Sequence, residues 1–240
     1  MAVSWEDEGI VIAVRRFGEH DAIVSLLTET QGRHVGLVKG GLGRKHRGIL
    51  QPGNVVKASW RARLDEHLGT YTVEGVHSYA ALALSNAEQL SGLSALCAMI
   101  ESTLPEREPH AELHERTLLL LENLGNTQWP AYYARWELAL LTDMGYGLDL
   151  SSCAATGGRD DLIYVSPKSG RAVSRTAGGP YAGKLFPLPA FIHQDSALPT
   201  TEEIAQSLAI TGYFFETRVF HPQKHELPAS RTRFVVRLKS

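Results

Sequence analysis

Apolar and polar residues alternate in short runs over the first third of the chain. Alternation over about four to eight residues is typical of half-buried strands, with glycine and proline in the turns between them. Five such runs occupy residues 10–17, 21–29, 32–40, 55–64 and 70–79, and the turns carry Gly18, Gly32, Gly40 to Gly43, Pro52-Gly53 and Gly69. Five strands within residues 6–80 predict a small barrel. An OB-fold fits this strand count, although the pattern does not separate it from an SH3-like barrel.

The apolar spacing changes from a strand period to a helical period after Tyr79. Helical spacing covers residues 80–104, 108–124 and 130–144, and proline or glycine interrupts it between these ranges. Pro130 suits the first turn of the third helix, and Gly145 marks its end. This third helix is apolar on nearly all sides, which indicates a central place in a helical core.

The remaining residues combine an irregular segment with two further helices. Residues 145–190 are rich in glycine and proline around one predicted hairpin, formed by LIYVSP, a turn at 168–170 and RAVS. Thr200 and Glu203 form a capping box for a helix that continues to about Phe220, and Pro228 opens a last helix. The sequence therefore predicts an α+β protein. We expect an OB-fold barrel in residues 1–80 and a mostly α-helical domain with a small β-hairpin insertion in residues 81–240.

Charge is distributed unevenly, although the net charge of the whole sequence is only −2. Residues 1–80 carry a net +1, residues 81–150 a net −7 and residues 151–240 a net +4, so any basic surface must be local. Cys97 and Cys153 are too few for a disulfide framework or a four-thiolate metal site. The acidic N-terminal segment does not fit a signal peptide, and no apolar run reaches the roughly 18 residues of a membrane span. We expect a cytoplasmic protein with reduced thiols.

The loop after the third predicted strand is the strongest candidate for chemistry. Gly40, Gly41 and Gly43 are interleaved with cations that have few local partners, namely Lys39, Arg44, Lys45 and Arg47. A flexible cationic loop on a strand-rich domain indicates contact with a nucleic-acid backbone, and a solvated basic loop is the alternative. Cations on the predicted barrel extend the DNA-binding set to Arg15, Arg16, Arg33, Arg61 and Arg63. Trp60 and Tyr71 are candidates for base stacking, although for Trp60, in an alternating strand, a core position is favoured.

Signatures of catalysis and metal binding are weak. His110 and His114 have the i, i+4 spacing that can hold zinc on a helix, but the segment EREPHAELHER is as polar as an ordinary solvated face. The glycines of the basic loop match neither a Walker A motif nor GxGxxG, and Cys153 has no histidine at a motif spacing. We therefore predict no catalytic residues, cofactor or metal. A zinc-dependent enzyme built on the two histidines is the weakest alternative.

Four segments, in this order, resemble the RecO family of bacterial recombination mediators. They are DEGIVIAVRRFGEHDAIVSLLTETQGRH, LVKGGLGRKHRGILQPGN, WRARLDEHLGTYTVE and RWELALLTDMGYGLDLSSC. The resemblance implies an OB-fold, a helical C-terminal domain, binding to single- and double-stranded DNA, strand annealing and action in RecF-type repair at the nucleoid. It also implies two partners, RecR and the acidic, phenylalanine-ended tail of single-stranded-DNA-binding protein. The alternative function is a protein-interaction adaptor whose basic barrel binds an acidic protein instead of DNA.

The resemblance also implies roles for particular residues. The family's basic loop is matched by Lys39, Arg44, Lys45 and Arg47. Arg135 matches an arginine placed to meet the acidic tail, and Arg231 matches a C-terminal Ser-Arg pair, so both are expected to bind the tail. Many family members hold zinc with four cysteines after the central helix, but only Cys153 of that set is present here. One thiolate cannot hold a structural zinc, so we expect residues 151–182 to be held by their hairpin and by packing.

Overall fold

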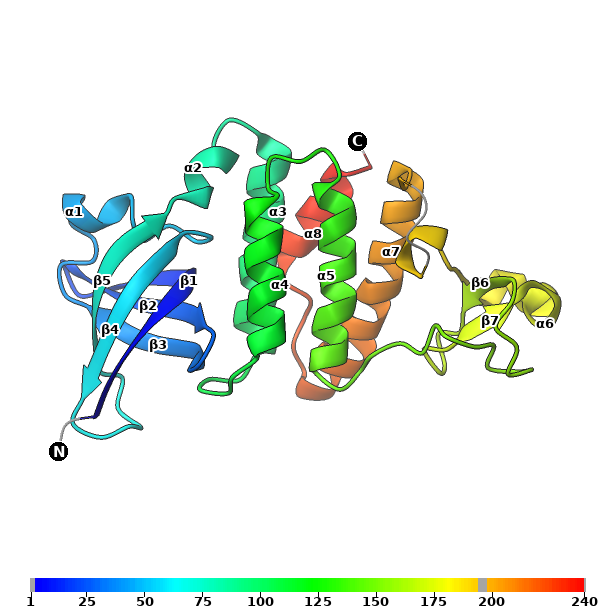
Figure 1. Cartoon of the computed structure of the whole chain (residues 1–240), viewed down its shortest axis with the longest axis horizontal. Helices are drawn as coiled ribbons and strands as arrows, with labels where there is room; N and C mark the ends of the chain where they lie inside the picture. Colours follow the sequence, from blue (N-terminus) through cyan, green and yellow to red (C-terminus); the bar gives the residue numbers. More distant parts are fainter. Residues whose placement is uncertain (1–2, 194–197, 240) are drawn as a thin grey trace. The chain divides into compact units, whose positions relative to one another are not determined.

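A closed five-stranded barrel forms the N-terminal part of the computed structural model, which describes residues 3–193 and 198–239 (Figure 1). Its strands are β1 (Val3–Phe17), β2 (Asp21–Thr28), β3 (Gly32–Val38), β4 (Val55–Ala62) and β5 (Thr70–His77). They follow the order β1-β2-β3-β5-β4 around the barrel, and all neighbours are antiparallel except β3 and β5. The five predicted strands and the OB-fold are confirmed.

Strand β1 closes the barrel because it is long enough to pair with two neighbours. Its residues 3–10 pair with β4 and its residues 9–17 pair with β2. A register shift in the middle of the strand lets it bend between these two partners. The seam between β3 and β5 is much shorter and consists of the pairs Leu37–Thr70 and Val38–Tyr71.

Trp60 and Tyr71 lie in the core of the barrel, with 0% and 2% of their surface exposed. Neither ring is accessible to a nucleobase, so both aromatic residues are core residues rather than stacking platforms. His34 shares this core, where its Nδ1 lies 2.9 Å from the Tyr71 hydroxyl. Burial, assisted by the charge of Arg107, lowers the pKa of His34 to about 4. The imidazole is therefore neutral at neutral pH and contributes to the packing of the barrel.

Helices complete the first compact unit, which comprises residues 1–126. They are α1 (Arg44–Arg47), α2 (Tyr79–Ala83), α3 (Ala87–Thr103) and α4 (Ala111–Glu122). The predicted helix over 80–104 is interrupted because the Asn86 side chain accepts hydrogen bonds from two backbone N–H groups and starts α3. Helix α3 packs on β1 and α4 on β2. The boundary at 80/81 marks the change from strands to helices, and as a domain boundary it remains a prediction.

The second compact unit, residues 127–240, is built around α5 (Trp129–Asp143), α7 (Thr201–Phe214) and α8 (Ala229–Arg237). Helix α5 packs against α7. Its Trp129 and Tyr133 rings contact the ring of Phe234 on α8, with centroids 5.8 and 4.9 Å apart. The central place predicted for the apolar helix over 130–144 is thereby confirmed within this unit.

Helix α7 begins at the predicted capping box, in which Thr200 and Glu203 exchange side chain-to-backbone hydrogen bonds. Its end differs from the prediction, in which the helix continues to about Phe220. After Phe214 the backbone changes to a π-helical turn, η3 (Phe215–Phe220), and then to a 3-10 turn, η4 (His221–Gln223). The apolar spacing predicts burial correctly here, since both ends of η3 are buried, but it does not reveal the change of helix type.

Residues between α5 and α7 form a small sheet that contains the predicted hairpin. Its strands, in the order β7-β6-β8, are β6 (Leu162–Val165), β7 (Ala172–Ser174) and β8 (Phe186–Pro187). The other elements of this segment are α6 (Arg175–Gly178), η1 (Gly179–Lys184) and η2 (Ala190–Ile192). Across the described parts of the chain, no helix has the length and apolar character needed to cross a membrane.

Candidate nucleic-acid interface

The turn between β1 and β2 holds the basic loop, residues 39–47, against the barrel. The backbone N–H of Gly40 donates to Oδ1 of Asp21 at 2.7 Å. Gly40 has a φ of +62°, and a Cβ on Gly41 would lie 2.8 Å from the Cβ of Ala22, so both positions favour glycine. The glycines therefore let the loop lie close to the barrel. The hydrogen bond to Asp21 fixes the loop at Gly40, and Arg44, Lys45 and Arg47 come after this point in the chain.

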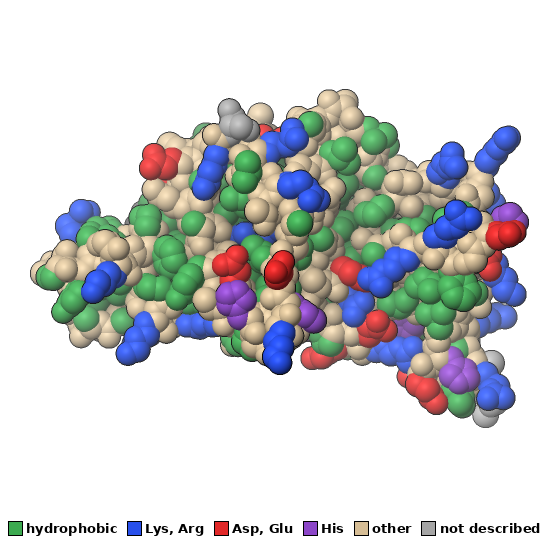
Figure 2. Space-filling view, turned by 180° about the vertical axis from the view of Figure 1, so that it is seen from behind, with side chains coloured by type: hydrophobic (Ala, Val, Ile, Leu, Met, Phe, Trp, Pro, Cys, Tyr) green, Lys and Arg blue, Asp and Glu red, His purple; other side chains and the backbone are tan. Residues whose placement is uncertain are grey.

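The cations of the basic loop are exposed, and no acidic partner for them lies among the residues that the structure describes. Helix α1 is a single turn with the sequence RKHR, and none of its residues is buried. Among the residues that the structure describes, no ion pair is formed by Lys39, Arg44, Lys45 or Arg47. Figure 2 shows Lys and Arg side chains projecting at the end of the view that carries the barrel. Surface charge of one sign that is not neutralised locally attracts a polyanion.

Three further cations of the predicted set are exposed on the barrel, but they do not gather at one place. Arg16 lies at the β1–β2 turn, where its Nε donates to the Gly18 carbonyl at 3.0 Å. Arg61 pairs with Ser4 near the start of β1, and Arg63 follows the end of β4. Arg16 therefore joins the basic loop, whereas Arg61 and Arg63 lie toward the other end of β1.

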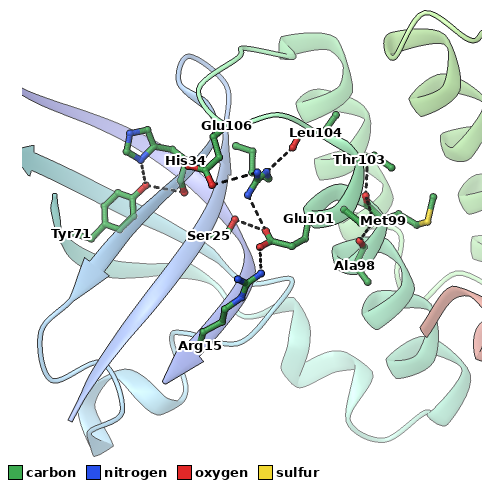
Figure 3. A network of polar contacts seen from close by, with 12 residues as sticks. Arg15, Ser25, His34, Tyr71, Ala98, Met99, Glu101, Thr103, Leu104 and Glu106 are labelled. Carbon is green, nitrogen blue, oxygen red and sulfur yellow. Dashed lines mark hydrogen bonds and ion pairs between the residues drawn. The ribbon is translucent and has the colours of Figure 1, made fainter. Parts of the chain in front are cut away.

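Glu101 on α3 engages the two remaining arginines of the predicted set (Figure 3). One of its oxygens lies 2.7 Å from Nη2 of Arg15, whose side chain is 70% exposed. Arg33 is 13% exposed, and its Nε donates to the Leu104 carbonyl at 2.8 Å. Its two Nη atoms each lie 3.5 Å from a carboxylate, one of Glu101 and one of Glu106. Arg33 therefore ties the segment after α3 to the barrel, and we do not retain it as a DNA contact.

Two residues of the first unit matter in the structure but were not singled out by the sequence pattern. Arg107 donates to the carbonyls of Asp65 and His67, and its guanidinium lies 6.0 Å from the Trp60 ring centroid. It thereby secures the β4–β5 loop. Phe17 ends β1 and is 50% exposed. An aromatic residue directly before a turn glycine was the available signal for it.

The two arginines predicted to bind a partner's tail have different surroundings in the second unit. Arg135 is exposed on α5, where its Nη2 donates to the Phe191 carbonyl at 2.7 Å and its guanidinium lies 5.8 Å from the Phe191 ring centroid. Arg231 is 4% exposed, and its Nε and Nη2 lie 2.7 and 2.8 Å from the two carboxylate oxygens of Glu137. Burial opposes the charge of Arg231, but the Glu137 carboxylate outweighs it and raises the pKa of the guanidinium. Since so little of Arg231 reaches the surface, we assign it to the core and not to tail binding.

Hydrogen bonds hold the segment around Cys153. Its Sγ accepts from the backbone N–H of Ser174 at 3.3 Å, and hydrogen bonds from Ser174 and Thr156 lower the pKa of this thiol to about 6. Asp149 accepts from Nε of Arg171 at 3.0 Å, which fixes the chain before Cys153 to the β6–β7 hairpin. The predicted hairpin thus takes part in holding this segment.

His110 and His114, the alternative zinc pair, occupy different environments. His110 is the N-cap residue of α4, whereas His114 lies on the buried side of that helix and is 6% exposed. Burial lowers the pKa of His114. Within residues 3–193 and 198–239, no group of three or more His, Cys, Asp or Glu side chains is arranged to hold a metal ion.

Comparison with known proteins identifies relatives that match most of the chain. The sequence model described as "Recombination protein O N terminal" matches residues 1–79, and the one described as "Recombination protein O C terminal" matches residues 84–227. Relatives named DNA repair protein RecO come from Rhodospirillum rubrum, with 46% identity over 99% of this chain and 97% of the relative, and from Cereibacter sphaeroides, with 52% over 88% of each. Another, from Methylocella silvestris, shares 42% identity over 97% of this chain and 95% of the relative. The matched regions include the barrel with its basic loop and most of the second unit.

Proposed function

Because this chain belongs to the RecO family of DNA repair proteins, we propose that it is a DNA-binding recombination mediator of the RecF-type pathway. RecO is a family of recombination mediators and not of catalytic enzymes. In the proposed role, the protein binds single- and double-stranded DNA at the nucleoid in the cytoplasm. It anneals complementary strands and helps to displace single-stranded-DNA-binding protein so that a recombinase can load.

The observation that carries this proposal is the set of unpaired cations on the basic loop. Lys39, Arg44, Lys45 and Arg47 are exposed, and none has an ion pair among the described residues. A structural role would place them against carboxylates, as Arg33 is placed against Glu101. Cations without such partners can exchange counterions for phosphates, and this exchange drives sequence-independent DNA binding.

The same charges give a physical route to strand annealing. Two complementary strands repel each other through their phosphates, and a cationic surface that contacts both lowers this repulsion. Phosphate contacts carry no sequence information, so any complementary pair is served. The proposed DNA contacts at the β1–β2 end of the barrel are Arg16, Lys39, Arg44, Lys45 and Arg47. Arg15 is a further proposed contact, for which a phosphate must compete with the Glu101 carboxylate. Arg61 and Arg63 form a separate proposed contact.

A salt titration of the unmodified protein tests the proposed function. Labelled oligonucleotides, single-stranded and duplex and of unrelated sequences, are titrated at several salt concentrations between about 50 and 200 mM. We expect binding of both forms with slight sequence preference and a steep linear fall of log K with log salt. Binding that does not respond to salt would contradict the proposal. Binding of an acidic polypeptide but of neither DNA form would favour the adaptor function instead.

The second unit is the proposed site for the protein partners. We place capture of the acidic, phenylalanine-ended tail of single-stranded-DNA-binding protein at Arg135, because this arginine is exposed and lies against the Phe191 ring. An exposed guanidinium held in this position can pair with a carboxylate of the tail. RecR is proposed as the other partner, without an assigned contact residue.

Replacement Arg135→Ala is expected to abolish or strongly reduce capture of a peptide that ends in acidic residues and phenylalanine. The measurement is a pull-down or an anisotropy titration with that peptide. Arg233→Ala is the matched control, since Arg233 is an exposed arginine on α8 of the same unit. Equal capture by the Arg135 variant and the control would remove Arg135 from the proposed tail site.

A further inference from the structure

Phe17 is an exposed aromatic side chain at the end of β1, next to the turn that holds the start of the basic loop. It is 50% exposed, whereas the tryptophan and tyrosine side chains of residues 3–79 are buried or half-buried. Its partner across the β1–β2 hairpin is Asp21, the residue that receives the N–H of Gly40. The aromatic ring and the start of the basic loop are therefore fixed to the same turn.

The strand register places Phe17 at the edge of an apolar strip on the outer face of the barrel. Arg15 lies two residues before Phe17 on the same face, opposite Ile23, and Ile23 lies opposite Leu37 of β3. Ile23 and Leu37 are half-buried, so part of each side chain is accessible. Lys39 follows Leu37 by two residues, where β3 ends. The strip thus has a cation on either side.

Helix α3 limits the length of this strip. Ser25, the next outward-facing residue of β2, is 3% exposed, and its hydroxyl donates to Glu101 of α3 at 2.7 Å. The open part of the face therefore ends before Ser25. It offers a short apolar contact near the start of the basic loop.

The chemistry of this surface fits a single strand better than a duplex. Bases of a duplex are stacked on one another and present only their edges, whereas bases of a single strand can be turned out onto an aromatic side chain. Two carboxylates belong to the same turn, Glu19 and Asp21, and Asp21 already accepts from Gly40. They are outnumbered by the cations at this end of the barrel, Arg16, Lys39, Arg44, Lys45 and Arg47.

We propose that Phe17 stacks on an unpaired base of single-stranded DNA while the basic loop holds the neighbouring phosphates. This inference rests on the proposed function and adds to it a contact that distinguishes single strands from duplexes. The stacking contact is independent of sequence, because every base has a flat face.

The experiment measures the affinity of the full chain for three ligands of equal length: a single-stranded oligonucleotide, its abasic counterpart and a duplex. With Phe17→Ala, single-strand affinity is expected to fall about 5- to 150-fold, as for the loss of one stacked base. Affinity for the abasic strand and for the duplex should remain unchanged, since both bind through phosphates. The salt slope for the single strand should also remain unchanged.

Two further variants control for loss of structure. Phe17→Tyr keeps the ring and should retain single-strand affinity. Leu119→Ala removes an apolar side chain of similar exposure, 53%, from α4 and should alter none of the three affinities. Equal single-strand affinity of the Phe17→Ala and unmodified proteins, or equal losses on the normal and abasic strands, would overturn the stacking proposal. In that case, a steep salt dependence of DNA binding by the unmodified protein would leave the proposed function intact. The absence of this salt dependence would contradict both the stacking proposal and the proposed function.

Discussion

A variant with Lys39, Arg44, Lys45 and Arg47 all replaced by glutamine is expected to bind DNA on the order of 100- to 1000-fold more weakly at moderate salt. Each phosphate neutralised by a cation contributes about 0.9 to the slope of log K against log salt for duplex DNA and about 0.7 for single strands. If all four cations contact phosphates, the slope should therefore fall by about 3 to 4. Titrations at several salt concentrations measure both quantities.

The matched control removes the same number of charges from the second unit. Lys168, Lys184, Lys224 and Lys239 are exposed and, among the described residues, form no ion pairs, so their replacement by glutamine changes the net charge equally. The control variant should keep most of the affinity and the slope. An identical slope for the basic-loop variant and the unmodified protein would show that this loop does not contact phosphates. Equal losses in both four-residue variants would show that only net charge matters.

Replacement Arg231→Met is expected to destabilise the second unit by about 3–5 kcal/mol, because it leaves the Glu137 carboxylate buried without its partner. Arg231 also donates to the Leu208 carbonyl at 2.7 Å and lies near the Thr211 hydroxyl, so one side chain joins α5, α7 and α8. A Cβ on Gly212 would lie 2.9 Å from its Nη1, which shows how closely α7 approaches the guanidinium. Native-state hydrogen exchange measures the effect for each unit separately.

In that measurement, backbone amides of α5 and α7 should exchange faster in the Arg231→Met variant, while those of β2 in the barrel keep their protection. The double variant Glu137→Leu, Arg231→Met removes both charges and should recover much of the lost stability. Unchanged protection of α5 and α7 in the single variant would show that the pair contributes little. A loss of tail-peptide capture with unchanged protection would instead return Arg231 to the tail site.

The barrel could be predicted from the sequence because local patterns determine most of it. Alternation identified all five strands, and the turn glycines placed their ends to within a few residues. The main underestimate was β1, predicted from residue 10 but beginning at Val3. Its first residues include Glu6, Asp7 and Glu8, and they form a strand because β4 lies beside them. Such pairing depends on a distant segment and leaves little apolar signal in the strand itself.

The candidate site was predictable only where charge remained without partners. Glycine spacing and cation density identified the basic loop correctly as an exposed cationic segment. The same density could not show that Arg33 meets Glu101 or that Arg231 meets Glu137, since these partners lie 68 and 94 residues away in the chain. Phe17 was missed for a reason that does not involve distant partners. Its place directly before a turn glycine marks the end of a strand, but this signal does not show whether the ring is covered.

The two-pair seam between β3 and β5 has a thermodynamic consequence. Leu37 belongs to this seam and also to the apolar strip beside Phe17, so the least extensively paired joint of the barrel borders the proposed binding face. A ligand that binds only the closed barrel shifts any opening of this joint toward closure, by an amount set by its concentration relative to its dissociation constant. Linkage makes the effect reciprocal: if DNA binds only the closed barrel, a change that secures the joint is expected to raise the affinity for DNA. The affinity for DNA and the free energy needed to open the joint between β3 and β5 are then linked quantities.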